Sequence, residues 1–138
     1  MKNLVSGLDE HVARWTAENF NLPIRSYDLA VGIIDGDRIV GSVIFNSYNG
    51  WDVEISYYGP NTMTLGLVKQ IARVAVNQLG VSRITARTTR NNKQMTRGVK
   101  KIGFEYEGIR HNAFGEYDAI MYGLYGKKLA KLAGKAMQ

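Results

Sequence analysis

The chain has 138 residues, a formal net charge of +6 and no cysteine, so it is long enough for one domain with its own core. The absence of cysteine excludes disulfides, thiolate metal sites and cysteine nucleophiles, and the two histidines lie too far apart in the sequence to indicate a metal site. No apolar run reaches membrane-spanning length and no secretory signal follows Met1, so we expect a cytoplasmic protein.

The first part of the chain predicts a helix followed by an antiparallel meander. Ser6 and Asp9 are typical of a helix start, and Pro23 ends the helical region. Hairpin turns are expected at Asp35-Gly36 and at Asn49-Gly50, where flanking alternation is typical of strands. The predicted strands cover residues 27–34, 37–46 and 51–58. Gly32 and Gly41 lie inside them, which indicates bulges or close packing.

The stretch from 51 to 79 is predicted to form a strand, a tight turn and a long helix. Alternation puts Trp51, Val53, Ile55 and Tyr57 on one strand face and Asp52, Glu54, Ser56 and Tyr58 on the other. From about Thr62 the apolar period becomes helical. No Asp or Glu occurs between Asn61 and Gly80, so this helix start has no acid of its own. It predicts either a phosphate site or a plain cap made by Asn61 or Thr62.

The second half of the chain predicts one parallel step and a final strand pair. A strand at 82–89 follows the long helix by a crossover, which makes it parallel to strand 51–58. A helix capped by Asn91-Asn92 precedes strands at 104–111 and 116–125. The element order α-β-β-β-α-β-α-β-β predicts a mixed α/β fold with helices on both faces of the sheet. We expect one domain of residues 1–126. Residues 127–138 are expected to form a solvated basic tail, ranked ahead of a short packed helix and a surface anchor.

Several short motifs occur in a fixed order after the long helix begins. They are QLGVSRITA at 78–86, NN at 91–92, KIGFEYEGIR at 101–110 and YDAIMYGL at 117–124. Together they resemble the GNAT superfamily of acyl-coenzyme A-dependent N-acetyltransferases. Within it they look closest to the branch that acetylates ribosomal-protein N-termini, and there to small phage and prophage members. The resemblance covers roughly residues 54 to 124, and the N-terminal third matches in element order only.

The resemblance implies that acetyl-CoA is the acyl donor and binds along strand 51–58 and the next helix start. The residues implied to hold it are Ile55, Ser56, Tyr57, Tyr58, Asn61, Thr62, Met63, Thr64, Leu65 and Asn92. The loop departs from the family pattern, because Pro60 and Thr62 stand where the family has glycines that let backbone approach phosphate. We therefore expect a degenerate phosphate-binding loop: either the hydroxyls of Thr62 and Thr64 replace the lost amide contacts, or the loop no longer binds phosphate.

The resemblance also implies a carboxylate base on the central strand, and Glu54 occupies that position. The general acid is less clearly marked. The family's serine or tyrosine positions hold Met95 and Val99, which have no proton to give. The neighbouring candidates are Thr96, Tyr58 and Tyr122. Tyr48, Trp51 and His111 are candidates for lining the acceptor pocket.

Three functions follow, in this order. The first is an N-acetyltransferase, monomeric or homodimeric, that moves an acetyl group from acetyl-CoA to a protein N-terminus, a lysine or a small amine. The second is a phage-type binding or structural module with this fold and weakened chemistry. The third is a nucleic-acid-binding protein that uses the lysine-rich tail together with Arg83, Arg87, Arg90, Lys93, Arg97, Lys100 and Lys101. It ranks last because these bases are spread over a strand, a turn and a helix without an aromatic platform.

Overall fold

Seven strands form one mixed sheet in the order β1-β2-β3-β4-β5-β7-β6 in a computed structural model, which describes residues 2–21, 24, 26–59, 64–89 and 93–134. The strands are β1 (Lys2–Val5), β2 (Leu29–Asp35), β3 (Arg38–Asn46), β4 (Asp52–Tyr58), β5 (Arg83–Thr89), β6 (Glu105–Phe114) and β7 (Tyr117–Tyr125). The helices are α1 (Asp9–Phe20), α2 (Leu65–Arg73), which continues as the π-helical segment η1 (Val74–Leu79), α3 (Lys93–Ile102) and α4 (Gly126–Leu132). The predicted mixed α/β fold is confirmed.

One parallel pair divides an otherwise antiparallel sheet. β4 and β5 run parallel, as the crossover through α2 predicts, and every other neighbouring pair is antiparallel. The sequence did not predict β1, whose four residues are too few to show an alternating pattern. This strand pairs with the edge of β2, and the amide of Leu4 donates to the Gln70 side chain of α2 at 2.8 Å.

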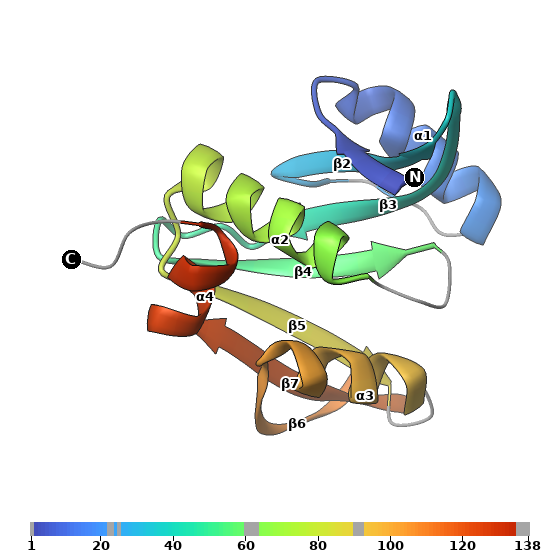
Figure 1. The fold of residues 1–138 in the computed structure, drawn as a ribbon. Helices are drawn as coiled ribbons and strands as arrows, with labels where there is room; N and C mark the ends of the chain where they lie inside the picture. Colours follow the sequence, from blue (N-terminus) through green and yellow to red (C-terminus); the bar gives the residue numbers. More distant parts are fainter. Residues whose placement is uncertain (1, 22–23, 25, 60–63, 90–92, 135–138) are drawn as a thin grey trace.

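The helices cover both faces of the sheet (Figure 1), as predicted. α1 packs on β2 and β3 through a small core of Val12, Ala30 and Ile44. The larger core lies on the other face, where Leu67, Val99 and Leu129 bring α2, α3 and α4 against the strands. Because strand side chains alternate, Val53 and Ile55 of β4 enter this larger core, whereas Glu54 faces the α1 side.

The helix after β4 differs from the prediction at both ends. It begins at Leu65 rather than near Thr62, because Thr64 is the N-cap: its hydroxyl oxygen accepts from the amide of Leu67 at 3.2 Å. Its last part is not α-helical. The wider π turn leaves Val74 and Ala75 both buried, and the segment ends at Gly80 in the left-handed region.

Other predicted boundaries shift by a few residues. The first hairpin turn is Gly36-Asp37, since Asp35 still pairs with Arg38. β6 continues past the expected end at 111 to Phe114. The backbone amide of Asn112 donates to the carboxylate of Asp118 at 3.0 Å, and the irregular pairing between Arg110 and Phe114 lies within the hairpin. The expected close packing at Gly41 is confirmed: a Cβ there would lie 2.8 Å from the carbonyl oxygen of Tyr58.

Three alternatives were open for the lysine-rich end of the chain. Its described part forms the packed helix. Leu129 of α4 is 2% exposed and belongs to the larger core. Lys128 pairs with Glu105 of β6 at 3.2 Å, and the hydroxyl of Tyr125 donates to the same carboxylate. These contacts lower the pKa of Glu105, first through the bond from Tyr125. No helix in the described ranges has the length and apolarity to cross a membrane.

Candidate active site

The parallel strands β4 and β5 form a fork. Their pairing runs from Asp52–Arg83 to Ile55–Ala86, and β4 then continues to Tyr58 and β5 to Thr89 as the two strands diverge (Figure 1). No strand of the described ranges fills the gap. The backbone N–H and C=O groups on the facing edges of the fork therefore stay available to an extended ligand, which can pair with them as an added strand would.

A polar network holds the closed end of the fork. The hydroxyl of Thr85 on β5 donates to the carboxylate of Asp52 on β4 at 2.9 Å. Arg83 lies 3.4 Å from the same carboxylate and also binds Glu107 of β6. The bond to Glu107 is the main cause that raises the pKa of Arg83. The strands are thus tied together at one end and free at the other.

A largely apolar cavity lies in the fork on the α3 side. About 420 Å³ of empty space surrounds it when open solvent is counted, and the enclosed part holds only a few water-sized groups. The residues that line it are Ile55, Tyr57, Ala86, Arg87, Thr88, Met95, Val99, Ile102, Phe104 and Tyr122. Burial raises the pKa of Tyr57, so its phenol stays neutral and can donate a hydrogen bond. An apolar slot with a few polar groups suits a flexible, mostly apolar ligand arm.

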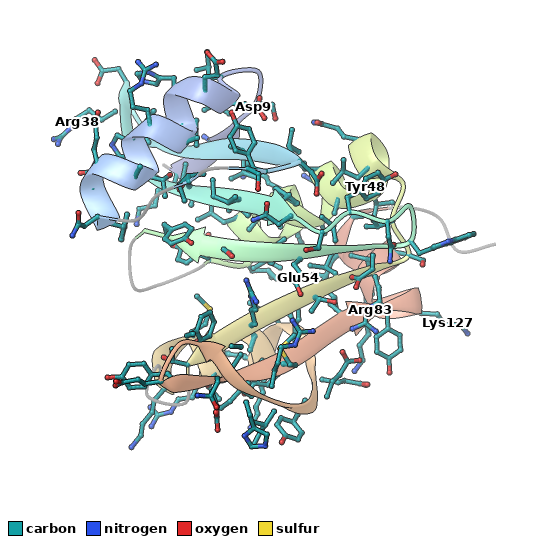
Figure 2. The ribbon with its side chains drawn as sticks, turned by 180° about the vertical axis from the view of Figure 1, so that it is seen from behind. Asp9, Arg38, Tyr48, Glu54, Arg83 and Lys127 are labelled. Carbon is teal, nitrogen blue, oxygen red and sulfur yellow. The ribbon has the colours of Figure 1, made fainter. Side chains whose placement is uncertain are left out.

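A charged cluster lies at the fork on the opposite face of the sheet. Glu54 points there from β4, and its side chain is only 15% exposed. The guanidinium of Arg87 on β5 and that of Arg110 on β6 each lie 3.7 Å from a Glu54 oxygen. Arg87 also lies over the ring of Phe114, 5.4 Å from its centroid. Figure 2 shows Glu54 between β4 and β5, on the face that carries α1.

The predicted catalytic residues occupy different sides of the fork. Glu54 is in the charged cluster, whereas Tyr122 is 1% exposed and lines the cavity on the other face. Met95 and Val99 also line the cavity. Thr96 lies on α3 and is not among the residues that line it. The structure therefore separates Glu54 from Tyr122 by the thickness of the sheet.

The predicted cofactor residues fall into three groups. Ile55 and Tyr57 line the cavity, while Ser56 and Tyr58 point to the other face, where Tyr58 packs on the α1 core and lies near Phe20. Thr64 and Leu65 form the start of α2, whose first turn carries no acid, as predicted. The remaining predicted cofactor residues lie outside the described residues: Asn61, Thr62, Met63 and Asn92, together with Pro60 of the expected degenerate loop.

Two of the three residues expected near an acceptor, Tyr48 and Trp51, do not lie at the fork. Tyr48 and Trp51 precede β4 and so lie at its far end; Tyr48 donates its hydroxyl to the carbonyl of Leu79 (Figure 2). Trp51 is 73% exposed because the strand begins one residue later, at Asp52. His111 lies in the irregular part of the β6–β7 hairpin beside Asp118. Their aromatic character was the only reason in the sequence to place these residues at the acceptor pocket, and it does not determine where a residue lies in the fold.

The described basic residues of the third interpretation do not share one surface, and Arg90 lies outside the described residues. Arg83 and Arg87 lie on the Glu54 face and are paired with carboxylates. Lys93, Arg97, Lys100 and Lys101 belong to α3, which packs on the opposite face. This division leaves the described bases without the continuous track that a nucleic-acid backbone needs.

Sequence reasoning missed Arg110 and gave Arg87 a different role. The available signal was alternation: Glu54 and Arg87 both fall on the polar face of neighbouring parallel strands. Arg110 could not be found this way, because a register shift between Tyr106 and Gly108 moves it. Within the described ranges, no group of three metal-ligating side chains occurs.

Comparison with known proteins identifies the family. Residues 6–105 match the model of the acetyltransferase (GNAT) domain. No curated protein matches the chain significantly. The chain therefore belongs to the GNAT acetyltransferase domain family, as the motifs predicted.

Solved structures share the fold at low sequence identity. A spermidine N-acetyltransferase variant from Vibrio cholerae superposes with a TM-score of 0.77 at 15% identity, covering 96% of both chains. An N-acetyltransferase from Staphylococcus aureus gives 0.70 at 13% identity, covering 91% of this chain and 97% of its own. A GNAT-family acetyltransferase from Bacillus anthracis gives a TM-score of 0.54 at 21% identity. The match covers 70% of this chain and 65% of that protein. These similarities concern the fold alone.

Proposed function

We propose that the protein is an N-acetyltransferase that moves an acetyl group from acetyl-CoA to a primary amine. The observation that carries this proposal is the fork: two parallel strands diverge beyond Ile55 and Ala86, with an apolar cavity on one face and Glu54 on the other. A donor and an acceptor can thus approach one point from opposite faces of the sheet.

The described residues fit the proposed donor. The free edge of β4 after Ile55 offers backbone groups to a pantetheine arm, and the cavity offers it apolar walls. The amides of Leu65 and Gly66 begin α2 and have no acceptor within the helix, so they suit the pyrophosphate. Lys69 and Arg73, exposed further along the same helix, add positive charge. Acetyl-CoA, when bound, supplies the acetyl group as an activated thioester.

The chain's own residues divide the proton transfers between the two faces. A Glu54 carboxylate oxygen takes a proton from the acceptor's ammonium, directly or through one water. On the cavity side, the hydroxyl of Tyr122 offers a proton to the leaving group. Thr96, the other predicted acid, does not line this cavity. The fork itself holds the two reactants in line, which is a large part of such rate enhancements.

The second interpretation, a module with weakened chemistry, also has a specific observation. Met95 and Val99 face the cavity from α3, so the helix that carries the acid in related enzymes offers none from those positions. This leaves donor binding intact and lowers turnover. The ribosomal-protein branch, the phage-type origin, the cytoplasmic location and the monomeric or homodimeric state stay predictions from the sequence.

Two measurements separate the interpretations. Calorimetry with acetyl-CoA tests binding, and release of CoA thiol in the presence of an amine panel tests transfer. Because the chain has no cysteine, a thiol reagent reports released CoA without background from the protein. We expect binding and amine-dependent thiol release. Binding without release from any amine supports the weakened module, and no binding at millimolar acetyl-CoA contradicts both.

The start of α2 gives a prediction in which stability and affinity change in opposite directions. Gly66 lies in the first helical turn, and a Cβ there would meet only Thr64 Oγ1 at 3.8 Å. We expect Gly66→Asp to raise the melting temperature, because it removes a helical glycine and adds about 0.3–1 kcal/mol of helix-dipole stabilisation. The same carboxylate should repel the pyrophosphate and weaken acetyl-CoA binding about tenfold.

Gly66→Ala is the matched control. It gains up to about 1 kcal/mol of helix propensity without adding charge, so its melting temperature should rise while its affinity stays near that of the wild type. Thermal melts give the melting temperatures, and calorimetry gives the acetyl-CoA affinities, of the wild type, Gly66→Asp and Gly66→Ala. Equal affinity for the Asp and Ala variants would show that the phosphates do not bind at this helix start.

A further inference from the structure

The charged cluster at the fork carries more positive than negative charge. Arg87 and Arg110 approach it from β5 and β6, and both share one carboxylate, that of Glu54. At 3.7 Å, each guanidinium is beyond hydrogen-bond distance of the nearest Glu54 oxygen. A carboxylate that serves only to pair with arginine normally forms short, often bidentate bonds. Both guanidinium groups thus keep donors that Glu54 does not use.

The three side chains of the cluster are buried to different depths, and their order suits a ligand that enters from solvent. Glu54 is 15% exposed, Arg87 31% and Arg110 55%, so the carboxylate lies deepest and the guanidinium groups lie nearer the solvent. Phe114 supports Arg87 from the β6–β7 hairpin through its ring. Arg87 is also among the residues that line the donor cavity, whereas its guanidinium lies beside Glu54 on the other face of the sheet. The cluster therefore touches the point where transfer would occur.

Resting on the proposed function, we infer that the acceptor is an amino carboxylate: a small amine that carries a carboxylate within a few bonds of its amino group. The ammonium binds at Glu54, where its proton is removed. The carboxylate binds across Arg87 and Arg110, whose planar donors match its geometry. Both guanidinium groups lie 3.7 Å from Glu54 oxygens, so one short molecule can reach both charges.

The same cluster disfavours a polyamine. Such an acceptor carries further positive charges beyond the reacting ammonium, and these would face Arg87 and Arg110. Like charges opposed across a partly buried site reduce affinity and select against the wrong partner. The specificity of this chain is thus expected to differ from that named for the spermidine N-acetyltransferase that shares its fold.

A matched substrate pair tests this inference. Phenylalanine and phenylalaninamide differ only in whether the group beside the amine is a carboxylate or a neutral amide. The amide's amine loses its proton more easily, so its intrinsic reactivity works against the expected result. We expect kcat/KM, from thiol release, to be at least about tenfold higher for phenylalanine, the order of one charge-assisted contact. Spermidine should be the poorest of the three acceptors.

Arg110→Gln tests the residue behind the preference. Arg110 is largely exposed on an edge strand, so its replacement should leave the fold intact. The variant should raise KM for phenylalanine about tenfold and change KM for phenylalaninamide far less, because the amide has no carboxylate for Arg110 to bind. Calorimetry of phenylalanine binding to the CoA-loaded protein should show the same loss without any turnover. Arg38→Gln, which removes the same charge from an exposed position on the distant β2–β3 hairpin, should change neither (Figure 2).

The outcomes are distinguishable. A preference for phenylalanine that disappears in Arg110→Gln but persists in Arg38→Gln supports the inference. Thiol release without such a preference, or with spermidine as the best acceptor, overturns the inference and leaves the proposed function standing. No thiol release from any amine overturns both. Equal losses for the two substrates in Arg110→Gln would mean that Arg110 only positions Glu54, and would also overturn the inference.

Discussion

Replacing Glu54 by glutamine should lower kcat by about 100- to 10,000-fold, the usual contribution of a general base. Glutamine keeps the shape of the side chain but cannot accept the ammonium proton. It also leaves Arg87 and Arg110 without their shared carboxylate, so the affinity for a cationic amine should fall. The loss of stability should stay below about 1 kcal/mol, because the two ion pairs are long and partly exposed. Initial rates of thiol release and thermal melts measure both effects.

Glu107→Gln is the matched control for this change. Glu107 lies on the same face of the sheet but pairs with Arg83 at the closed end of the fork. Its loss removes the same charge from the same surface, so kcat should stay within a few-fold of the wild-type value. If the two variants lost activity equally, the effect would belong to the surface charge, and Glu54 would have no special part in proton transfer.

The second large effect is expected from filling the cavity. Ala86 is the last β5 residue paired with β4, is 8% exposed and lines the cavity. Leucine at this position should occupy the space that the pantetheine arm needs and weaken acetyl-CoA binding at least about tenfold. Because the added atoms enter existing empty space, the cost in stability should be at the low end of the roughly 1–3 kcal/mol that overpacking incurs. Calorimetry and denaturant unfolding give the two quantities.

Ala86→Ser provides the comparison at the same site. Serine adds one polar atom but little volume, so the cavity stays open and the affinity should remain close to that of the wild type. An Ala86→Leu variant that folds and binds acetyl-CoA normally would show that the donor does not enter this cavity.

The main parts of the fold were predictable because they depend on local patterns. Alternation along 51–58 and the helical period after it both reflect burial on one side, and the crossover rule then made β4 and β5 parallel. β1 escaped prediction because its four residues depend on pairing with the edge of β2. The π-helical turn of η1 also escaped, since its apolar residues fit a helix of either width.

The candidate site was predictable only in part. Glu54 could be placed from the polar face of its strand together with the family resemblance. Arg110 could not, because its approach to Glu54 depends on the order of β5, β7 and β6 and on an irregularity in β6. The fork itself has no sequence signal, since divergence of two strands depends on what packs between them. Residues 60–63 and 90–92, which hold several of the predicted contacts, lie outside the described residues.

The central claim is that acetyl-CoA pairs with the open edge of β4 beyond Ile55. Amide hydrogen exchange, followed with and without saturating acetyl-CoA, tests it most directly because it reads the backbone itself. We expect added protection for the amides of residues 56–58 and at the start of α2, with little change in the β2–β3 hairpin. Unchanged exchange over residues 56–58, under conditions where calorimetry shows the ligand bound, would contradict it.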